Sequence, residues 1–433
     1  MSPDAQFVLN TFAFLIWGAL VMWMAAGFTM LESGSVRTKN ASVICLKNLG
    51  LYAIAGLAFY VVGYNIMYVD VTGWIGSFSL FYTASDAEIA LVGGNEAMKS
   101  EVIDNGYSVM SDWFFQMVFV ATAASIVSGA LAERIRLWAF FAFVLVLTAF
   151  IYPVVGAWTW GAGWLSELGF SDFAGSTIVP STGGWAALAG AIILGPRLGK
   201  FKKDGTVTPT PPSSVPIVTL GVFILWFGWF GFNGGSQLAL GSVSDAVSVA
   251  GILVNTNLAG AAGVLAAILV SRPILGGFDL FAILNGALAG LVSITAAPAM
   301  HQHWLAIVIG FIGGVICVLS IKLLDKLKVD DVVGAVPVHL FAGIWGTIAV
   351  AFTVREAGSF VDQLLVQLLG IGAVGIFVFA ASFGVWKLID VLLGGIRVTK
   401  TVERIGQDAA ELGVDAYPEF VLMPEEYDDE DDK

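Results

Sequence analysis

Membrane-spanning segments constrain this chain more than any other feature of its sequence. A spanning helix needs about 20 mostly apolar residues, and the sequence contains a long series of such stretches. They predict an all-α polytopic membrane protein of eleven transmembrane helices, at about residues 8–31, 43–67, 112–132, 137–156, 174–195, 215–240, 246–270, 279–297, 304–325, 334–353 and 362–393.

The composition agrees with this prediction and excludes several classes of protein. Apolar residues make up 58% of the chain and charged residues 12%, about half of what a soluble domain carries. The net charge of −13 argues against a partner that is a nucleic acid. The chain is too apolar to be disordered, and its two cysteines are too few for a disulfide-stapled secreted domain.

The lysines and arginines predict how the spans are oriented, because cationic loops remain in the cytoplasm. With the N-terminus outside the cell, all of the 20 lysines and arginines except Lys99 and Arg355 fall on the inner side. An odd number of spans then places the C-terminus inside. We therefore expect a multi-pass protein of the cell membrane, inner or plasma, surrounded by lipid bilayer.

The chain divides into two halves and a tail. The loop at 198–214 is rich in proline and threonine and separates two sets of five helices. The predicted parts are a membrane domain at 1–393, its repeats at about 8–195 and 215–353, its last helix at 362–393, and a cytoplasmic tail with an acidic end at 394–433.

Two features inside the predicted spans point to function. His339 lies in the tenth span, and an ionisable group in hydrocarbon is a candidate for a transport pathway, although a lone buried histidine can also be structural. Aromatic residues crowd into WFFQMVF, AWTWGAGW and LWFGWFGFNGGS. These clusters suit either interfacial belts and core packing, or a cation–π site and a constriction in a narrow pore.

Signatures of an enzyme are missing from the sequence. It contains no HExxH, GxSxG or Walker motif, and its three histidines are too few for a haem or a di-metal centre. We therefore expect no enzymatic activity, no cofactor and no metal site, which leaves the movement of a solute.

Seven segments resemble one family, over essentially the whole chain. They read AGFTMLESGSVRTKNA, DWFFQMVFVATAASIVSGALAERIR, DFAGSTIVPSTGGWAALAGAIILGPR, WFGWFGFNGGS, NTNLAGAAG, LNGALAGLVSITA and VDDVVGAVPVHLFAGIWG. In this order they are similar to the ammonium transporter (Amt/Rh) family, of the bacterial Amt type.

The resemblance implies an architecture and a set of partners. It implies a homotrimer in which each subunit has its own narrow hydrophobic pore, built from two inverted five-helix repeats and an eleventh helix that crosses the bundle. Ammonium or methylammonium would be the solute. The cytoplasmic tail is similar to the segment where a PII signal protein docks in many bacterial members, although a solvated amphipathic tail would look the same.

The resemblance also implies roles for individual residues. In the family's proposed mechanism, ammonium sheds a proton at an aromatic site, neutral ammonia passes the pore, and the proton moves along two histidines. By motif position, Phe115, Trp160 and Ser236 resemble the outer ammonium-binding site, Phe119 and Phe232 the stacked gate below it, Asp172 a buried carboxylate that shapes the site, and His339 one member of the histidine pair.

The sequence departs from the family pattern at the other histidine. Where the family reads TIVHSTGG, this chain reads TIVPSTGG, so Pro180 takes the position. Proline cannot carry a proton, and inside a helix it frees a backbone carbonyl. Three interpretations remain open: an ammonium transporter with impaired or altered conduction, an ammonium-binding sensor with little flux, or a channel for another small solute.

Overall fold

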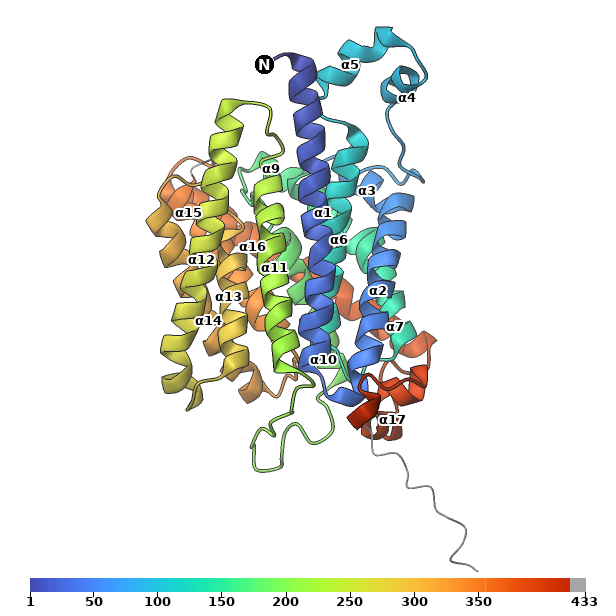
Figure 1. Ribbon diagram of the computed structural model, residues 1–433, viewed down its shortest axis with the longest axis vertical. Helices are drawn as coiled ribbons and strands as arrows, with labels where there is room; N and C mark the ends of the chain where they lie inside the picture. Colours follow the sequence, from blue (N-terminus) through green and yellow to red (C-terminus); the bar gives the residue numbers. More distant parts are fainter. Residues whose placement is uncertain (355, 421–433) are drawn as a thin grey trace, which may run out of the picture.

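The computed structural model describes residues 1–354 and 356–420, so Arg355 and the acidic end beyond residue 420 are not among the described residues. The chain forms a bundle of long helices with the N-terminus at one end and the C-terminal segment at the other (Figure 1). The main helices are α1 (Pro3–Ser35), α2 (Ala41–Ala58), α3 (Tyr64–Tyr68), α4 (Asp86–Val92), α5 (Lys99–Asp104), α6 (Val109–Ala130), α7 (Leu137–Val146), α8 (Tyr152–Thr159), α9 (Trp164–Glu167), α10 (Thr182–Leu194), α11 (Val215–Gly235), α12 (Val243–Leu275), α13 (Leu280–Ile294), α14 (His303–Leu327), α15 (Ala342–Thr353), α16 (Phe360–Leu392) and α17 (Lys400–Ile405).

The helices account for the predicted spans. Within the described residues, ten segments are long and apolar enough to cross a membrane. They match ten of the eleven predicted spans, and the remaining one, at 279–297, is the shorter apolar helix α13. Its 15 residues extend about 22 Å at the usual helical rise, less than the bilayer core. The prediction of an all-α polytopic membrane protein is confirmed.

Several spans contain a π-helical turn, in which the backbone bonds reach five residues back. These turns are η2 (Phe59–Gly63) between α2 and α3, η4 (Leu147–Ile151) between α7 and α8, η5 (Thr177–Ser181) before α10, and η6 (Val336–Phe341) before α15. Such turns are rare and often mark functional sites.

Local sequence explains where the long helices begin and end. The Ser242 side chain caps α12 by accepting the N–H of Asp245, and Ser359 and Asp362 form a reciprocal capping box at the start of α16. The chain leaves α12 through Gly276, whose φ of +89° is in the left-handed region that favours glycine.

Small residues allow the helices to pack closely. A Cβ atom added at Gly221 of α11 would lie 2.4 Å from the backbone nitrogen of Leu31 in α1, and one added at Gly310 of α14 would lie 2.2 Å from the carbonyl oxygen of Ala259 in α12. These contacts leave room only for glycine, as is common where membrane helices cross.

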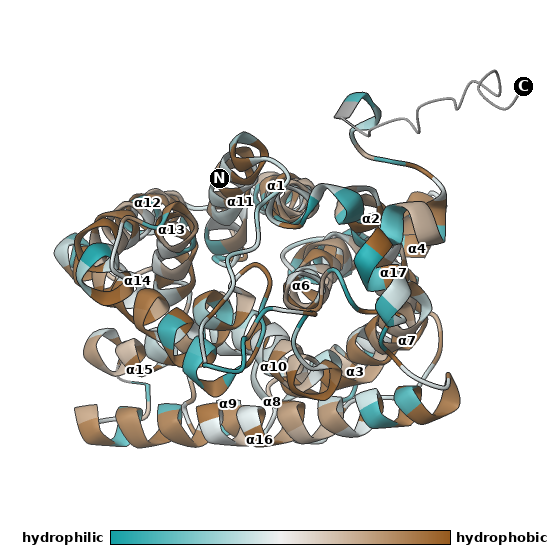
Figure 2. Cartoon of the chain, turned by 90° about the horizontal axis from the view of Figure 1, so that it is seen from below, coloured by the Kyte–Doolittle hydropathy of each residue, from teal (hydrophilic) through white to brown (hydrophobic). Residues whose placement is uncertain are grey.

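Helix α16 is oriented differently from the rest of the bundle. Seen from below, α16 lies lengthwise along one side while many of its neighbours are viewed end-on (Figure 2). It packs against α10, α15 and α7, and its outer face exposes large apolar side chains such as Leu365, Ile376 and Val391. An apolar outer surface suits a helix that faces lipid.

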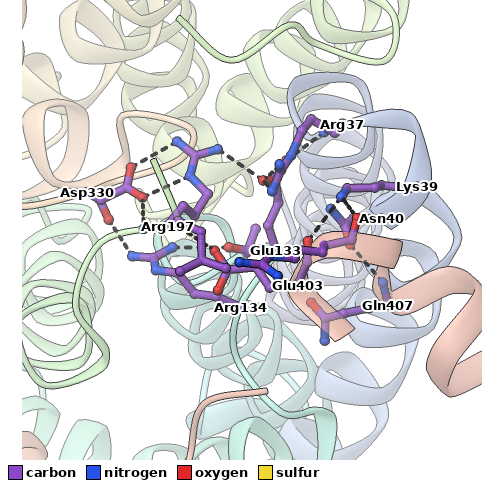
Figure 3. A network of polar contacts seen from close by, with 12 residues as sticks. Arg37, Lys39, Asn40, Glu133, Arg134, Arg197, Asp330, Glu403 and Gln407 are labelled. Carbon is purple, nitrogen blue, oxygen red and sulfur yellow. Dashed lines mark hydrogen bonds and ion pairs between the residues drawn. The ribbon is translucent and has the colours of Figure 1, made fainter. Parts of the chain in front are cut away.

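A network of charged residues holds together the end of the bundle opposite the N-terminus (Figure 3). Arg197, which follows α10, donates two hydrogen bonds to the Asp330 carboxylate, at 2.8 and 2.9 Å, and its third nitrogen lies 3.3 Å from Glu133. Burial raises the pKa of Asp330, but the bonds and charge of Arg197 and the charge of Arg134 outweigh it and hold that pKa well below its usual range.

The C-terminal segment packs onto the same end of the bundle. Asp408 accepts the backbone N–H groups of Ser42 and Val43, both at 2.8 Å, at the start of α2. Glu403 accepts the N–H of Leu198 at 2.6 Å and pairs with Arg397 at 2.7 Å. The segment 394–420 is therefore joined to both the α2 end and the loop between the two halves.

Candidate functional site

Four aromatic residues from separate parts of the chain meet in the interior. Phe115 and Phe119 lie on α6, Trp160 follows α8, and Phe232 lies on α11. The Phe119 ring centroid is 4.8 Å from that of Phe115, 5.9 Å from Trp160 and 4.1 Å from Phe232. The structure thus brings together the aromatic residues that the sequence singled out, with Phe119 at their centre.

The phenylalanine pair closes the space between α6 and α11. The rings of Phe119 and Phe232 are inclined by 32° and both side chains are buried. A third ring, Trp229, lies 5.4 Å from Phe232 and is anchored by a hydrogen bond to Thr295. A hydrated ion cannot pass such packed rings without losing its water shell.

Ser236 stands at the end of α11, beside the aromatic group. Its hydroxyl donates to the carbonyl oxygen of Phe232 at 2.8 Å, so its proton is used within the helix. The oxygen keeps capacity to accept a hydrogen bond from a solute.

Asp172 connects the start of η5 to Trp160. Its carboxylate accepts the backbone N–H groups of Thr177 and Ile178 at 2.9 and 3.0 Å, and its carbonyl oxygen accepts the indole N–H of Trp160 at 3.0 Å. Burial raises the pKa of Asp172 to about 6, against the lowering effect of these backbone donors. Gly175 has a φ of +101°, and a Cβ atom there would lie 2.9 Å from the Trp160 ring.

His339 lies in η6. It is 3% exposed, its ring is 6.2 Å from that of Phe28, and its Nδ1 atom has no hydrogen-bond partner among the described residues. It borders a cavity of about 10 Å³, which is lined also by residues of α1, α6 and α13. A space of that size is at the lower limit for one water molecule.

The turns η5 and η6 share one local design. Asp172 and Asp331 each accept backbone N–H groups within the next six residues, and each is followed after three residues by a glycine of positive φ, Gly175 at +101° and Gly334 at +79°. Eight residues after Asp172 is Pro180, and eight after Asp331 is His339. The two positions are equivalent in the two halves.

Contacts between the two turns repeat the same equivalence. A Cβ atom added at Gly184 would lie 2.7 Å from Leu340, and one added at Gly343 would lie 2.4 Å from Ser181. Counted along the sequence, Gly184 follows Asp172 by the same number of residues as Gly343 follows Asp331. Ser181 and Leu340 are likewise equally far along the sequence from these two aspartates. The two helices therefore cross at a point of approximate twofold symmetry.

The backbone around Pro180 adapts to the missing N–H. The carbonyl of Ser176, which a residue with an N–H at position 180 could bond, accepts both the N–H and the hydroxyl of Ser181 at 3.0 Å. Thr182 donates its hydroxyl to Thr177. Neither Pro180 nor these hydroxyl-bearing residues are among those that border the cavity beside His339.

One buried charged pair escaped the sequence analysis. Glu32 of α1 and Lys47 of α2 are almost wholly buried, with Lys47 Nζ 3.7 Å from Glu32 Oε2. The signal was present, since Lys47 falls inside the predicted span 43–67 and Glu32 directly follows 8–31. Ionisable residues at such positions are candidates for function.

Known proteins of similar sequence show which family the chain belongs to. The sequence model of the Ammonium Transporter Family matches residues 12–417. The chain belongs to the ammonium transporter family. It is 40% identical to Ammonium transporter Amt2 of Archaeoglobus fulgidus, over 95% of this chain and 89% of the relative, and 34% identical to the Ammonium transporter of Bacillus subtilis, over 93% and 97%.

Solved structures give the same result for the fold of this ammonium transporter family member. A structure named Sensor Amt Protein is 36% identical, with a TM-score of 0.86 over 95% of this chain and all of that one. Candida albicans Mep2 is 27% identical, with a TM-score of 0.80 over 96% and 92%. The protein is thus a multi-pass membrane protein of a family of transporters, not enzymes.

Proposed function

We propose that this protein moves ammonium, as ammonia and a proton, through a narrow apolar pore in each subunit, with conduction altered by Pro180. The observation that carries the proposal is the packing of Phe119 against Phe115 and Phe232 in the interior, together with a buried histidine, His339, whose Nδ1 atom has no partner among the described residues. Relatives named ammonium transporters support the substrate.

The orientation follows from the charges. The network of Arg37, Arg134 and Arg197 lies at the end of the bundle that carries the C-terminal segment (Figures 1 and 3). Cationic segments face the cytoplasm, so this end is inner and the aromatic site is nearer the outer surface. Below, "outer" and "inner" are used in this sense.

At the outer site, the aromatic rings and one hydroxyl receive the cation. Trp160 and Phe115 offer ring faces for cation–π attraction, and the Ser236 oxygen accepts one N–H of ammonium. A bare cation in an apolar pore suffers a large desolvation penalty, so the ion leaves a proton behind and neutral ammonia passes Phe119 and Phe232. Potassium has no proton to lose and finds no cage of oxygen ligands.

Below the gate, the proton path differs from that of a pore with two histidines. His339 can carry a proton because its ring has two nitrogens and a pKa near neutrality in water. Pro180, at the equivalent position, has no such group. A single imidazole therefore serves the pore, and we expect slower or differently coupled conduction.

A second function, an ammonium sensor with little flux, has one observation in its favour. Position 180 carries a proline instead of an imidazole, while the aromatic residues of the outer site are in contact with one another. A solved structure of similar fold is named Sensor Amt Protein.

The assembly and the tail belong to the same proposal. We expect a homotrimer of subunits with two inverted five-helix repeats, and the approximate symmetry at the crossing of η5 and η6 supports the inverted arrangement. The segment 394–420 lies at the inner end beside the loop between the halves, where a PII signal protein could dock. Residues 1–393 form the transport domain in this proposal.

The experiment is an ammonium jump on proteoliposomes that carry the purified protein, with current recorded and methylammonium uptake measured in parallel. Potassium is the control cation. Pro180→His is the test variant, and Pro337→His, which places an imidazole in the equivalent turn η6, is its matched control.

The results separate the two functions. Ammonium current or uptake by the unaltered protein supports transport. Binding of ammonium without flux, together with flux through Pro180→His but not Pro337→His, would support the sensor. Equal currents with potassium and ammonium would contradict both.

A further inference from the structure

Glu32 is a buried carboxylate with an unused oxygen. Its Oε2 atom accepts the hydroxyl of Ser128 at 2.6 Å and lies 3.7 Å from Lys47, while its Oε1 atom has no hydrogen-bond partner among the described residues. Lys47 donates to the carbonyl of Ser128 at 2.8 Å. A buried charged oxygen without a partner is unfavourable unless water or another group reaches it.

The unused oxygen belongs to a residue that shares a cavity with His339. The cavity of about 10 Å³ is bordered by Glu32 and His339 together, with Ser125 and Asn285 as the other polar residues. Nδ1 of His339 also has no partner. Two proton-carrying side chains thus border one water-sized space, and each has one free polar atom.

Gly129 keeps this space open. A Cβ atom added there would lie 2.4 Å from the Val333 side chain and 3.5 Å from Cγ of Glu32. The glycine of α6 therefore lies between the carboxylate and the loop that leads into η6.

A second, larger cavity shares three lining residues with this one. Asn285, Val333 and Gly334 border both this cavity and a larger one of about 550 Å³, which is also lined by Arg197 and Asp331 at the inner end. The space beside Glu32 and the larger cavity therefore share part of their lining.

We propose that Glu32 is the proton acceptor of the inner half of the pore and takes over part of the role that a second imidazole would have. The inference rests on the proposed transport of ammonium. In the step, a water in the cavity takes a proton from the His339 ring and gives one of its own to Oε1 of Glu32. The imidazolium becomes neutral, the carboxylate becomes a carboxyl, and no other bond changes.

The surroundings of Glu32 suit a group that both takes and releases a proton. Lys47 on α2 is the cation that faces it, Cys45 is the other titratable group nearby on that helix, and His339 faces it from η6. Lys47 favours the carboxylate and so prepares it as an acceptor, and its distance of 3.7 Å leaves Oε1 free. Release toward Asn285 and the larger cavity restores the starting state.

The test uses variants that separate charge from packing. Glu32→Gln keeps the size of the side chain but leaves Lys47 buried without its counter-ion, so the double variant Glu32→Gln/Lys47→Met removes the pair together. Asp112→Asn is the matched control, since Asp112 is a buried carboxylate of α6 whose oxygens are bonded by Tyr64 and Gln116 away from the cavity.

The first readout is the charge moved per methylammonium taken up by proteoliposomes. We expect both Glu32 variants to lower this ratio by about tenfold or more, and Asp112→Asn to leave it unchanged. Structural damage would lower current and uptake together and keep their ratio. An unchanged ratio in the double variant, or uptake without current in the unaltered protein, would overturn the role of Glu32.

The second readout does not require flux. Infrared difference spectra on adding ammonium should show a buried carboxyl band that is lost in Glu32→Gln and kept in Asp112→Asn. If the unaltered protein takes up no methylammonium, the transport proposal fails by the first readout, while this band still decides whether Glu32 exchanges a proton. Its absence overturns the inference.

Discussion

The turns η5 and η6 are built alike, yet they carry different side chains at equivalent positions. Each begins with an aspartate that accepts backbone N–H groups, turns through a glycine of positive φ, and crosses the other at a second glycine. Eight residues after the aspartate, one turn carries Pro180 and the other His339. This backbone arrangement is common to both halves, and the imidazole is present in only one.

This difference shows that the backbone arrangement does not depend on the imidazole. In η5 the carbonyl of Ser176 is bonded by Ser181, and the aspartate fixes the start of the helix. The backbone can therefore accept proline at a position where the other half has histidine. In the proposed pore, shape and proton transfer would therefore be separable properties, and the following predictions test that separation.

The largest effect is expected when Asp172 or Asp331, the aspartate that accepts the backbone N–H groups of its turn, is removed. Asp172→Ala leaves the N–H groups of Thr177 and Ile178 buried without an acceptor, at about 1–3 kcal/mol each. We expect an unfolding free energy lower by about 2–6 kcal/mol and loss of uptake. Asp331→Ala should cost less, because Asp331 is half-buried and borders the larger cavity.

Thermal denaturation of the purified protein in detergent measures this contrast. If Asp331→Ala lowered the melting temperature more than Asp172→Ala, the order of importance of the two aspartates would be reversed.

The next effect is a dependence of stability on pH that arises from Asp172. Its pKa is about 6 in the folded protein against an ordinary 3.8, so the folded state binds its proton more tightly than the unfolded state does. The stabilisation is therefore complete below about pH 3.8 and declines as the pH rises to about 6, by about 3 kcal/mol for about two units.

Melting temperatures across this pH range provide the measurement. Asp172→Asn should reduce the decline by the part that Asp172 contributes, and Asp331→Asn should reduce it as well, because burial also raises the pKa of Asp331. A decline that is undiminished in Asp172→Asn would assign it to other groups.

A smaller effect is expected at the crossing of the two turns. Gly184→Ala and Gly343→Ala each place a methyl group within 2.8 Å of backbone or side-chain atoms of the other turn, and such overpacking costs about 1–3 kcal/mol. Because the two glycines are equivalent, we expect similar losses in melting temperature. A large effect at one and none at the other would show that the crossing is not symmetric. Gly372→Ala, which meets nothing within 4 Å, is the control.

The smallest expected change in free energy comes from substitutions at the two equivalent positions, 180 and 339, which we expect to differ in function. His339→Ala should lower the ammonium current by about tenfold or more, equivalent to about 1.4 kcal/mol, with little change in melting temperature. Pro180→Ala should leave the current nearly unchanged, because it removes no proton carrier. Equal loss of current in both variants would mean that position 180 contributes through shape after all.

Much of this molecule could be predicted from its sequence. The spans follow from apolar length, which is why only the short helix α13 differs from a full crossing. The π-helical turns η5 and η6 could not be predicted, because they depend on where Asp172 and Asp331 find backbone donors after folding. The proximity of Glu32 to His339 also requires the fold, since more than 300 residues separate them. Pro180 was visible at once, but its equivalence to His339 rests on counting from two aspartates.

The inner charged network has a consequence for the kinetics of the pore. Arg197 belongs to the first half and holds Asp330 of the second half and Glu133 of the first. A carrier alternates by rocking one half against the other, and an ion pair that joins the two halves resists this rocking. We infer that passage depends on rotations of Phe119 and Phe232, which are fast motions of single side chains. Uptake should then show only weak saturation as the solute concentration rises, and it should survive covalent cross-linking of the two halves at their inner ends. Loss of uptake on cross-linking would show that the halves move.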